Sequence, residues 1–155
     1  MPVGKLLIAN RGEIAIRIAR AAEELGIPSV AIYSTDDHSS LHTKMASESH
    51  ALEGSGVSAY LNIEHMVDTA IATGCDAVHP GYGFLAENAG FVQRLEEEGI
   101  TFIGPSADVI TLLGDKIEAR AAMEAAGLPT AKGSSEPISE ASVASALADE
   151  IGYPV

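Results

Sequence analysis

Two polar segments that contain glycine hold the residue types that could bind a ligand. Asn10-Arg11-Gly12-Glu13 follows a short apolar run, and residues 79–88 include Tyr82 between Gly81 and Gly83. Arginine can pair with an anion, glycine lets the backbone come close to a ligand, and an aromatic ring can pack on an apolar group. Each segment alone could equally be a turn that leads into a helix. The two together favour a binding site.

Apolar runs alternate with amphipathic stretches along most of the chain, which is typical of βαβ units. The pattern predicts an α/β fold class: a Rossmann-like parallel sheet, in strand order about 3-2-1-4-5, with helices on both faces. In this order strands one and four are neighbours where the order reverses, so the two polar segments would line one crevice. The predicted strands are 6–9, 29–33, 49–52, 75–79 and 100–103; the predicted helices are 13–25, 41–46, 63–73, 88–98, 107–113, 115–126 and 139–151, the last with Ser139 as its N-cap.

The chain changes character near residue 130, where residues 132–137 have the composition of a linker. We therefore expect one domain over residues 1–130. Over residues 131–155 we expect a linker, a helix and the truncated start of a second domain. The last four residues, Gly152-Tyr153-Pro154-Val155, are expected to open a strand whose remainder is missing, which indicates a fragment of a longer protein.

The composition argues against several classes of partner. Nine Lys and Arg against 22 Asp and Glu give a formal net charge of -13, so the chain lacks the basic face that nucleic acid or an anionic membrane surface attracts. No apolar run approaches the roughly 20 residues that span a bilayer, and the N-terminus lacks the apolar region of a signal peptide. We expect a cytoplasmic protein with no nucleic-acid or membrane partner.

The sequence also lacks the usual signatures of metal, disulfide and nucleotide sites. The one cysteine, Cys75, permits no internal disulfide and is expected to be a buried small side chain rather than a nucleophile. The five histidines show no metal-binding spacing, so no metal site is predicted. Neither G-x-G-x-x-G after the first strand nor G-x-x-x-x-G-K-[ST] occurs, which argues against an NAD-binding domain and a P-loop kinase.

Several segments occur together in an order and spacing that resemble one protein family. The set looks like the N-terminal, pre-ATP-grasp domain of biotin carboxylase, the ATP-dependent component of biotin-dependent acyl-CoA and pyruvate carboxylases, and it covers essentially the whole chain. The matching segments are Asn10-Arg11-Gly12-Glu13-Ile14-Ala15-Ile16-Arg17, His79-Pro80-Gly81-Tyr82-Gly83-Phe84-Leu85-Ala86-Glu87-Asn88, Phe102-Ile103-Gly104-Pro105, Gly114-Asp115-Lys116 and Ile151-Gly152-Tyr153-Pro154-Val155.

The resemblance implies a reaction in two stages. ATP phosphorylates bicarbonate to carboxyphosphate, and the CO2 released from it is captured by biotin on a separate carrier domain. The implied cofactors are ATP, biotin on its carrier and Mg2+, the last held by an ATP-grasp domain beyond Val155. The implied partners are bicarbonate, the biotinyl carrier domain, a carboxyltransferase component and a second copy in a homodimer. No catalytic residue is expected within these residues, which would be inactive alone.

The resemblance also implies roles for individual residues. Lys116 would reach the ATP phosphates, and Tyr82 and Gly83 would contact biotin. Two further groups would have structural roles. The binding loops would be supported by Arg11, Glu13, Glu87 and Asn88, and the dimer interface would include Arg20 and Glu24. Of the nine cations, chiefly Arg11 and Lys116 are expected near the crevice, so the chain alone should bind ATP poorly.

The residues by themselves leave other interpretations open. Lys116 could be a solvated lysine, Tyr82 could pack on its own loop, and Arg20 with Glu24 could be an exposed i,i+4 ion pair. Glu53–Tyr60 departs from the family because it lacks a proline-containing turn, so the loop after the third strand is not predicted. The alternative functions are another ATP-grasp ligase, such as a carbamoyl-phosphate or purine-pathway enzyme, and a non-catalytic structural or dimerisation module. The sequence does not specify which acyl-CoA or keto acid accepts the carboxyl group.

Overall fold

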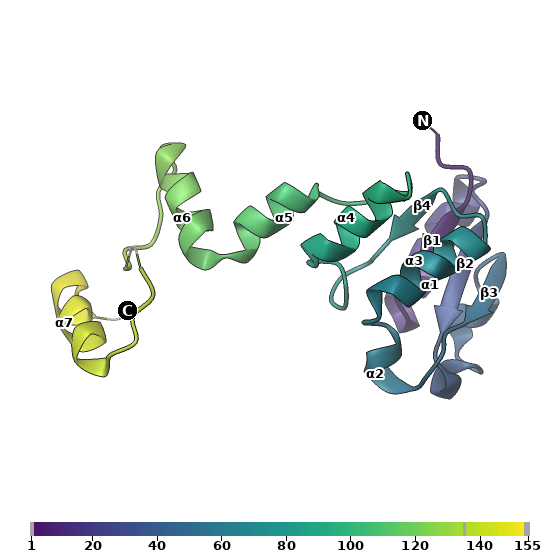
Figure 1. Cartoon of the computed structure of the whole chain (residues 1–155), viewed down its shortest axis with the longest axis horizontal. Coiled ribbons are helices and arrows are strands. Elements are labelled where there is room, and N and C mark those ends of the chain that lie inside the picture. The colour runs from purple at the N-terminus through teal and green to yellow at the C-terminus, as the bar shows by residue number, and fades with distance from the viewer. Residues whose placement is uncertain (1, 135, 154–155) are drawn as a thin grey trace. The chain divides into compact units, whose positions relative to one another are not determined.

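A parallel sheet of five strands forms the centre of the N-terminal part of the chain (Figure 1). The computed structural model describes residues 2–134 and 136–153. The strand order is β3-β2-β1-β4-β5, which confirms the predicted order and makes β1 and β4 neighbours. The strands are β1 (Leu6–Ile8), β2 (Ser29–Tyr33), β3 (Glu48–Ala51), β4 (Ala77–His79) and β5 (Thr101–Phe102).

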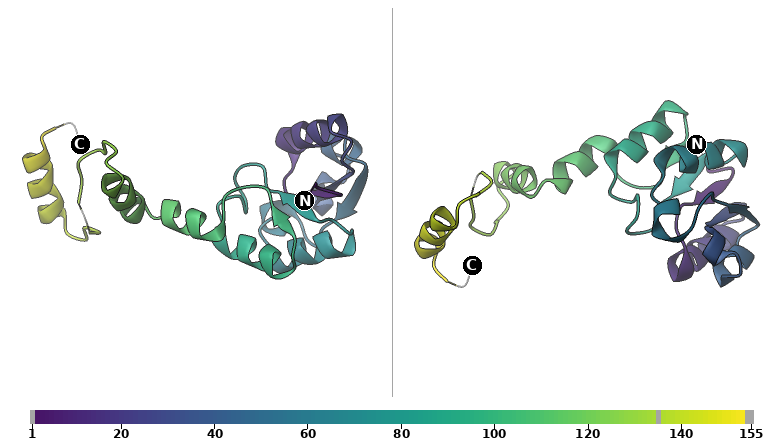
Figure 2. Two further views of the ribbon diagram at one scale, coloured as in Figure 1. Left: turned by 90° about the horizontal axis from the view of Figure 1, so that it is seen from above. Right: turned by 60° about the horizontal axis from the view of Figure 1, so that its bottom comes forward.

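Alternate side chains of the sheet enter two separate cores, because successive side chains in a strand point to opposite faces. Leu7 and Val78 lie in one core with Phe91, on the side of α3 (Ile63–Ala72) and α4 (Ala89–Glu97). Ile8 lies in the other core with Ile18, on the side of α1 (Gly12–Glu24). Figure 2 shows α1 on one face of the sheet and α3 and α4 on the other, which confirms the predicted helices on both faces.

Helix α1 shows how the local sequence sets the ends of an element. Its apolar residues recur every three to four positions, and one side of the helix is buried. At its C-terminal end Gly26 adopts a φ of 69°, a region that favours glycine. The N–H groups of Gly26 and Ile27 then donate to the carbonyls of Glu23 (3.0 Å) and Ala22 (2.8 Å), which is a Schellman motif. This turn ends the helix and leads the chain into β2.

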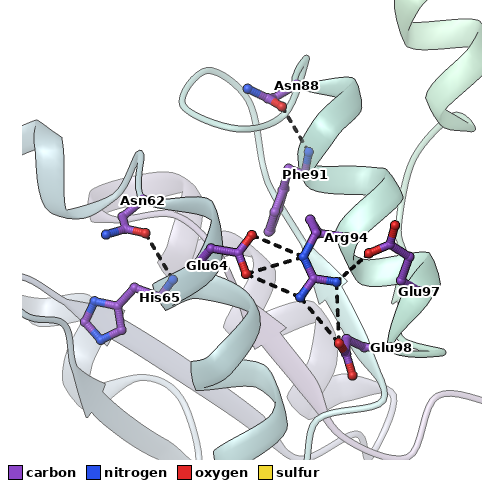
Figure 3. Close-up of polar contacts among 8 residues, drawn as sticks. All are labelled: Asn62, Glu64, His65, Asn88, Phe91, Arg94, Glu97 and Glu98. Carbon is purple, nitrogen blue, oxygen red and sulfur yellow. Dashed lines mark hydrogen bonds and ion pairs between the residues drawn. The ribbon is translucent and has the colours of Figure 1, made fainter.

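Asparagine side chains cap the first turns of α3 and α4 (Figure 3). The side-chain oxygen of Asn62 accepts the N–H of His65 at 3.1 Å, and that of Asn88 accepts the N–H of Phe91 at 2.9 Å. Each cap satisfies a backbone donor that has no partner within its helix, so the two asparagines define where the helices begin.

An arginine of α4 joins the two helices at the surface. The Arg94 guanidinium lies between Glu64 of α3 on one side and, on the other, Glu97 at the end of α4 and its C-cap Glu98, as Figure 3 shows. Its Nε is 3.1 Å from a Glu64 oxygen, and its Nη1 is 2.7 Å from a Glu97 oxygen. The carboxylates raise the pKa of Arg94, the hydrogen bond to Glu64 most of all. Because all these groups are near water, the cluster orients α4 against α3 more than it stabilises the fold.

Three local elements differ from the predictions. The helix predicted at 41–46 is a 3₁₀ helix, η2 (Leu41–Lys44), and two short elements were not predicted, η1 (Thr35–Asp37) and α2 (Gly56–Ala59). Segments of three or four residues are too short to show a hydrophobic period. The predicted N-cap Ser139 is wrong, because Glu140 is still extended and α7 (Ala141–Ile151) begins after it.

The strand expected at the end of the chain is not formed by its described residues. Gly152 and Tyr153 follow α7 without strand structure, and Pro154 and Val155 lie outside the described residues.

The chain divides into two compact units, Met1–Ile110 and Thr111–Val155, each described by itself. Helix α5 (Ala107–Gly114) runs across the division, and α6 (Lys116–Ala125) and α7 lie in the second unit. None of the described residues from 111 to 153 is buried, whereas the first unit holds both cores. The domain boundary expected at residue 130 stays a prediction. In the part of the chain that the structure describes, no helix is long and apolar enough to cross a membrane.

Candidate functional site

Asn10 joins the loops that follow β1 and β4. The residue is 3% exposed, and its side-chain nitrogen donates to the carbonyl oxygens of Pro80 (2.7 Å) and Tyr82 (2.9 Å). Its side-chain oxygen accepts the N–H of Arg11 at 2.8 Å. Because the carboxyl ends of adjacent parallel strands share one edge of the sheet, a single buried amide can fix both loops. The two polar segments of the sequence are therefore in direct contact.

Gly81 permits this close contact. It has a φ of 66°, and a Cβ placed on it would lie 2.8 Å from Asn10 Nδ2 and 3.1 Å from Ile14 Cγ1. A larger residue would push the two loops apart. Gly83 also has a positive φ, 69°, but a Cβ there would meet nothing within 4 Å, so this side of the loop faces open space.

An ion pair anchors the first loop to η1, the short helix that follows β2. Arg11 Nη2 donates to one Asp37 oxygen at 2.7 Å, and Arg11 Nε lies 2.6 Å from the other. The Tyr60 hydroxyl also donates to Asp37 (2.8 Å), and Ser40 Oγ donates at 3.1 Å. The Arg11 hydrogen bond is the largest cause that lowers the pKa of Asp37 to about 2. Asp37 is thus a fixed anion that holds Arg11 in place.

Tyr60 extends this connection to the second loop. It is 1% exposed, its hydroxyl accepts the N–H of Ser34 at 3.0 Å, and burial raises its pKa. Its ring stacks on Phe84 with centroids 5.3 Å apart. Phe84 has a φ of 46°, which is uncommon for a residue other than glycine. The stacking on Tyr60 and the adjacent core hold this strained backbone in the loop that carries Tyr82.

Tyr82 itself is exposed and held at two points. It is 62% exposed, its carbonyl accepts from Asn10, and its hydroxyl donates to a Glu13 oxygen at 2.7 Å. The hydrogen bond to Glu13 raises the pKa of the Tyr82 phenol. An aromatic ring is thus presented to solvent in a fixed place above the carboxyl edge of the sheet, an arrangement that suits contact with an apolar ring.

His79, the last residue of β4, supports the start of the Tyr82 loop. It is half-buried, and its Nδ1 accepts the N–H of Gly81 at 3.0 Å. Burial lowers the pKa of His79, which favours the neutral imidazole that can accept this bond. The histidine side chain therefore accepts a backbone hydrogen bond from the loop.

The other expected loop and interface residues lie further along the same elements. Asn88 caps α4, and the exposed Glu87 before it makes no side-chain hydrogen bond or ion pair with the described residues. Arg20 and Glu24 lie exposed on α1, where they line one shallow hollow with Glu13. No ion pair joins Arg20 to Glu24 in the described part of the chain.

Lys116 belongs to the second unit. It is the exposed first residue of α6, directly after the N-cap Asp115, whose carboxylate accepts the N–H groups of Ile117 (2.8 Å) and Glu118 (3.1 Å). The Asp115 carboxylate compensates the helix dipole at the same end, which reduces the cost of placing a lysine there.

Cys75 is buried, as predicted, and burial raises the pKa of its thiol, which disfavours the reactive thiolate. Across the residues that the structure describes, no group of three or more His, Cys, Asp or Glu side chains could hold a metal ion.

Sequence reasoning missed the residues that connect the loops to each other. Neither Asp37 nor Tyr60 was singled out, and no contact was predicted for Asn10 or Phe84. Asp37 could have been found, because it follows β2 and parallel strands end at one edge of the sheet. Tyr60 lies at the end of the loop after the third strand, which the sequence did not predict, so no role was assigned to it.

Comparison with known proteins shows the same architecture. The family model described as biotin carboxylase, N-terminal domain, matches residues 2–110, and one described as carbamoyl-phosphate synthase L chain, ATP binding domain, matches residues 115–155. Among solved structures, the biotin carboxylase domain dimer of the Hydrogenobacter thermophilus 2-oxoglutarate carboxylase, in complex with MgADP, ADP and bicarbonate, is 48% identical with a TM-score of 0.94. That match covers 99% of this chain and 34% of the other chain.

Curated relatives match at a similar level. Biotin carboxylase 2 of Bacillus subtilis is 53% identical over 152 residues, and biotin carboxylase of Pseudomonas aeruginosa is 51% identical over 153 residues. Each match covers 97% of this chain and 34% of the relative, so the chain spans about a third of the length of these relatives. With a family model over most of its length and relatives half identical to it, the chain belongs to the biotin carboxylase family, and its residues 2–110 match the N-terminal domain.

Proposed function

We propose that this chain contributes to the ATP-dependent carboxylation of biotin by bicarbonate, through carboxyphosphate, as the N-terminal part of a biotin carboxylase. The observation that carries the proposal is identity of about 50% along the whole chain to proteins named biotin carboxylase. Because the chain spans about a third of their length, we propose that the activity belongs to a larger polypeptide and that these residues are inactive alone.

Tyr82 and Gly83 are the proposed biotin contacts. The exposed Tyr82 ring offers an apolar face, and the open side of Gly83 leaves room for a ligand next to the backbone. Arg11, Glu13, Glu87 and Asn88 are the proposed supports of these loops. The biotin itself would arrive on a carrier domain, and a carboxyltransferase component would use the carboxylated product.

Lys116 is the proposed contact to the ATP phosphates. Arg11, the other cation expected near the crevice, is already paired with Asp37, so it is not free to bind phosphate. The Hydrogenobacter relative binds MgADP and bicarbonate. We propose that residues outside the chain hold the Mg2+ that accompanies the nucleotide, together with the nucleotide phosphates.

Arg20 and Glu24 are the proposed dimer contacts, on the exposed side of α1. The Hydrogenobacter structure is a dimer, which supports a homodimer here. We propose the cytoplasm as the compartment, in keeping with one buried free cysteine. The alternative of another ATP-grasp ligase is not favoured: the model that matches residues 115–155 is named for carbamoyl-phosphate synthase, but relatives about 50% identical along the whole chain are named biotin carboxylase.

A hybrid enzyme tests the proposal. In it, these residues replace the matching third of Bacillus subtilis biotin carboxylase 2. We expect ATP hydrolysis that requires both bicarbonate and biotin, and no such activity from the 155 residues alone. ATP hydrolysis that does not depend on biotin would contradict the proposed function and favour another ligase.

Replacing Lys116 in the hybrid enzyme tests its role. Lys116→Ala should lower the biotin-dependent rate of ATP hydrolysis roughly 10- to 100-fold, because the phosphate charge loses a partner. Lys44→Ala is the matched control, since Lys44 is also exposed but lies in η2. An unchanged rate in Lys116→Ala, measured with saturating bicarbonate and biotin, would remove this lysine from the mechanism.

A further inference from the structure

The loop that carries Tyr82 has its backbone fixed but its aromatic side chain largely in solvent. Asn10 holds the Tyr82 carbonyl at 2.9 Å, and Phe84, two residues later, is held by stacking on Tyr60. These contacts fix where the Cα of Tyr82 lies. They do not fix the ring, which is 62% exposed and would otherwise rotate about its side-chain bonds.

Glu13 supplies the contact that fixes the ring. Its carboxylate accepts the Tyr82 hydroxyl at 2.7 Å, across 69 positions of sequence. Glu13 lies in the first turn of α1, and this helix is held against the sheet by Ala15 and Ile18, both buried. The acceptor therefore sits on a rigid element, while the donor sits at the free end of an exposed side chain.

Glu13 bonds to Tyr82 although a cation of its own helix is within the usual pairing distance along the sequence. Arg17 lies one turn further along α1, at the i+4 position that favours a Glu–Arg ion pair, and both residues line the same hollow. In the described part of the chain the carboxylate is bonded to the Tyr82 hydroxyl and makes no ion pair with Arg17. Glu13 thus joins the first turn of α1 to the loop that carries Tyr82 and makes no side-chain pair along its own helix.

We propose that Glu13 is a positioning residue that holds the Tyr82 ring in the orientation in which it meets biotin. This inference rests on the proposed function. A ring held before the ligand arrives loses less side-chain freedom on binding, so the contact costs less free energy. Loss of Glu13 should therefore weaken biotin binding and leave the ATP part of the reaction unaffected.

The first experiment tests the contact itself in the full chain, without any ligand. Tyrosine labelled with 13C at Cζ gives one signal for each of the four tyrosines, and Tyr82→Phe identifies the signal of Tyr82. We expect the Tyr82 phenol to titrate at a lower pH in Glu13→Gln than in the wild type, because a neutral amide does not oppose its ionisation. Glu23→Gln, an exposed glutamate on the same helix, should leave the midpoint unchanged. An identical midpoint in wild type and Glu13→Gln would overturn the proposal.

The second experiment measures positioning in the hybrid enzyme. Glu13→Ala and Tyr82→Phe should each raise the KM for biotin about two- to fivefold, the loss expected for one exposed hydrogen bond, with kcat and the KM for ATP unchanged. The double variant should be no worse than either single variant, since both remove the same bond. Glu13→Gln, which keeps an acceptor oxygen, should stay close to the wild type, and Glu23→Ala serves as the control.

The two experiments separate failure of this inference from failure of the proposed function. If the wild-type hybrid shows no biotin-dependent hydrolysis, the proposed function is contradicted, whereas the phenol titration still decides whether Glu13 holds Tyr82. If the hybrid is active but Glu13→Ala leaves the KM for biotin unchanged, or if the effects of the two single variants add, the positioning role is wrong.

Discussion

Asp37 is the residue on which the support of both loops converges. Its carboxylate accepts from Arg11, Ser40 and Tyr60, which come from the β1 loop, the segment after β2 and the end of α2. The Asp37 side chain is only 10% exposed, so water has little access to replace these hydrogen-bond donors. Neutralising it would leave the Arg11 charge without its counter-charge and would weaken the hydrogen bond that the buried Tyr60 hydroxyl donates.

The pH dependence of stability should report on Asp37. Its pKa is lowered to about 2 in the folded chain against an ordinary value of 3.8, so its contribution is complete above about pH 4 and is lost as the pH falls towards 2. Because Arg11 is 45% exposed, we expect a contribution of roughly 1–2 kcal/mol at pH 7 rather than the full value of the shift. Asp37→Asn should lower the free energy of unfolding by that amount at pH 7, and less at pH 2.5, as measured by urea denaturation.

Asp68→Asn is the matched control for this measurement, since Asp68 is exposed on α3. It should leave both the stability at pH 7 and its decline in acid unchanged. If wild type and Asp37→Asn lose stability in parallel between pH 4 and pH 2.5, the ion pair with Arg11 does not stabilise the fold.

Residue types could be predicted from the sequence more easily than residue contacts. Tyr82 and Gly83 stood out because a tyrosine between glycines is unusual, and both lie in the loop at the sheet edge. The contact of Asn10 with Pro80 and Tyr82 spans 70 residues or more, and it depends on the register that places Ile8 beside His79. Sequence patterns predict which strands are neighbours, but not the register to within one residue.

Among the elements, α4 connects the Tyr82 loop to the core. Asn88 ends that loop and caps the helix through the N–H of Phe91, and Phe91 is fully buried against the sheet. A change at Asn88 should therefore affect the helix and the loop together, whereas Asn62 caps α3 far along the chain from the loop.

Removing the cap of α4 should destabilise the fold by a modest amount. Asn88→Ala should lower the free energy of unfolding by about 1 kcal/mol, because the Phe91 N–H loses its acceptor. Asn88→Asp, which keeps an acceptor oxygen, should lower it much less. Asn62→Ala is the matched control for a lost cap and should cost a similar amount while leaving the exchange of the amide protons in residues 83–87 unchanged. Equal exchange in Asn88→Ala would show that the cap does not hold the loop.

The success of the element predictions follows the length and burial of each element. The strands around β1 are apolar runs buried on both faces, and α1, α3 and α4 show a clear helical period, so both types were predictable. The edge strand β3 has the sequence Glu48-Ser49-His50-Ala51, mostly exposed, and its signal was weak. The segments η1 and α2 have no period to detect, yet they hold Asp37 and lead into Tyr60, so part of the site support was out of reach.

At the scale of the whole molecule, buried apolar surface is concentrated in the first unit. Both faces of the sheet are covered there, and a smaller cluster of Val92, Ala107 and Ile110 joins the start of α5 to α4. In the second unit, Leu112, Leu113 and other large apolar side chains are exposed. Since burial of apolar surface is the main stabilising contribution to folding, the first unit should set the stability of the chain.

Two truncations test this distribution of stability. A chain that ends at Gly114 keeps the whole of α5. Because none of the described residues after Gly114 is buried, its Tm should lie within about 2 °C of that of the full chain. A chain that ends at Ser106 also loses Ala107 and Ile110, and the gap left beside Val92 should lower the Tm by about 5 °C or more. Thermal unfolding followed by circular dichroism measures both, and hydrogen exchange in the full chain should be slow in β1, β2 and β4 and fast in α6 and α7. A large loss of Tm on ending the chain at Gly114, or slow exchange in α6, would show that the second unit stabilises the fold through contacts that its exposed side chains do not indicate.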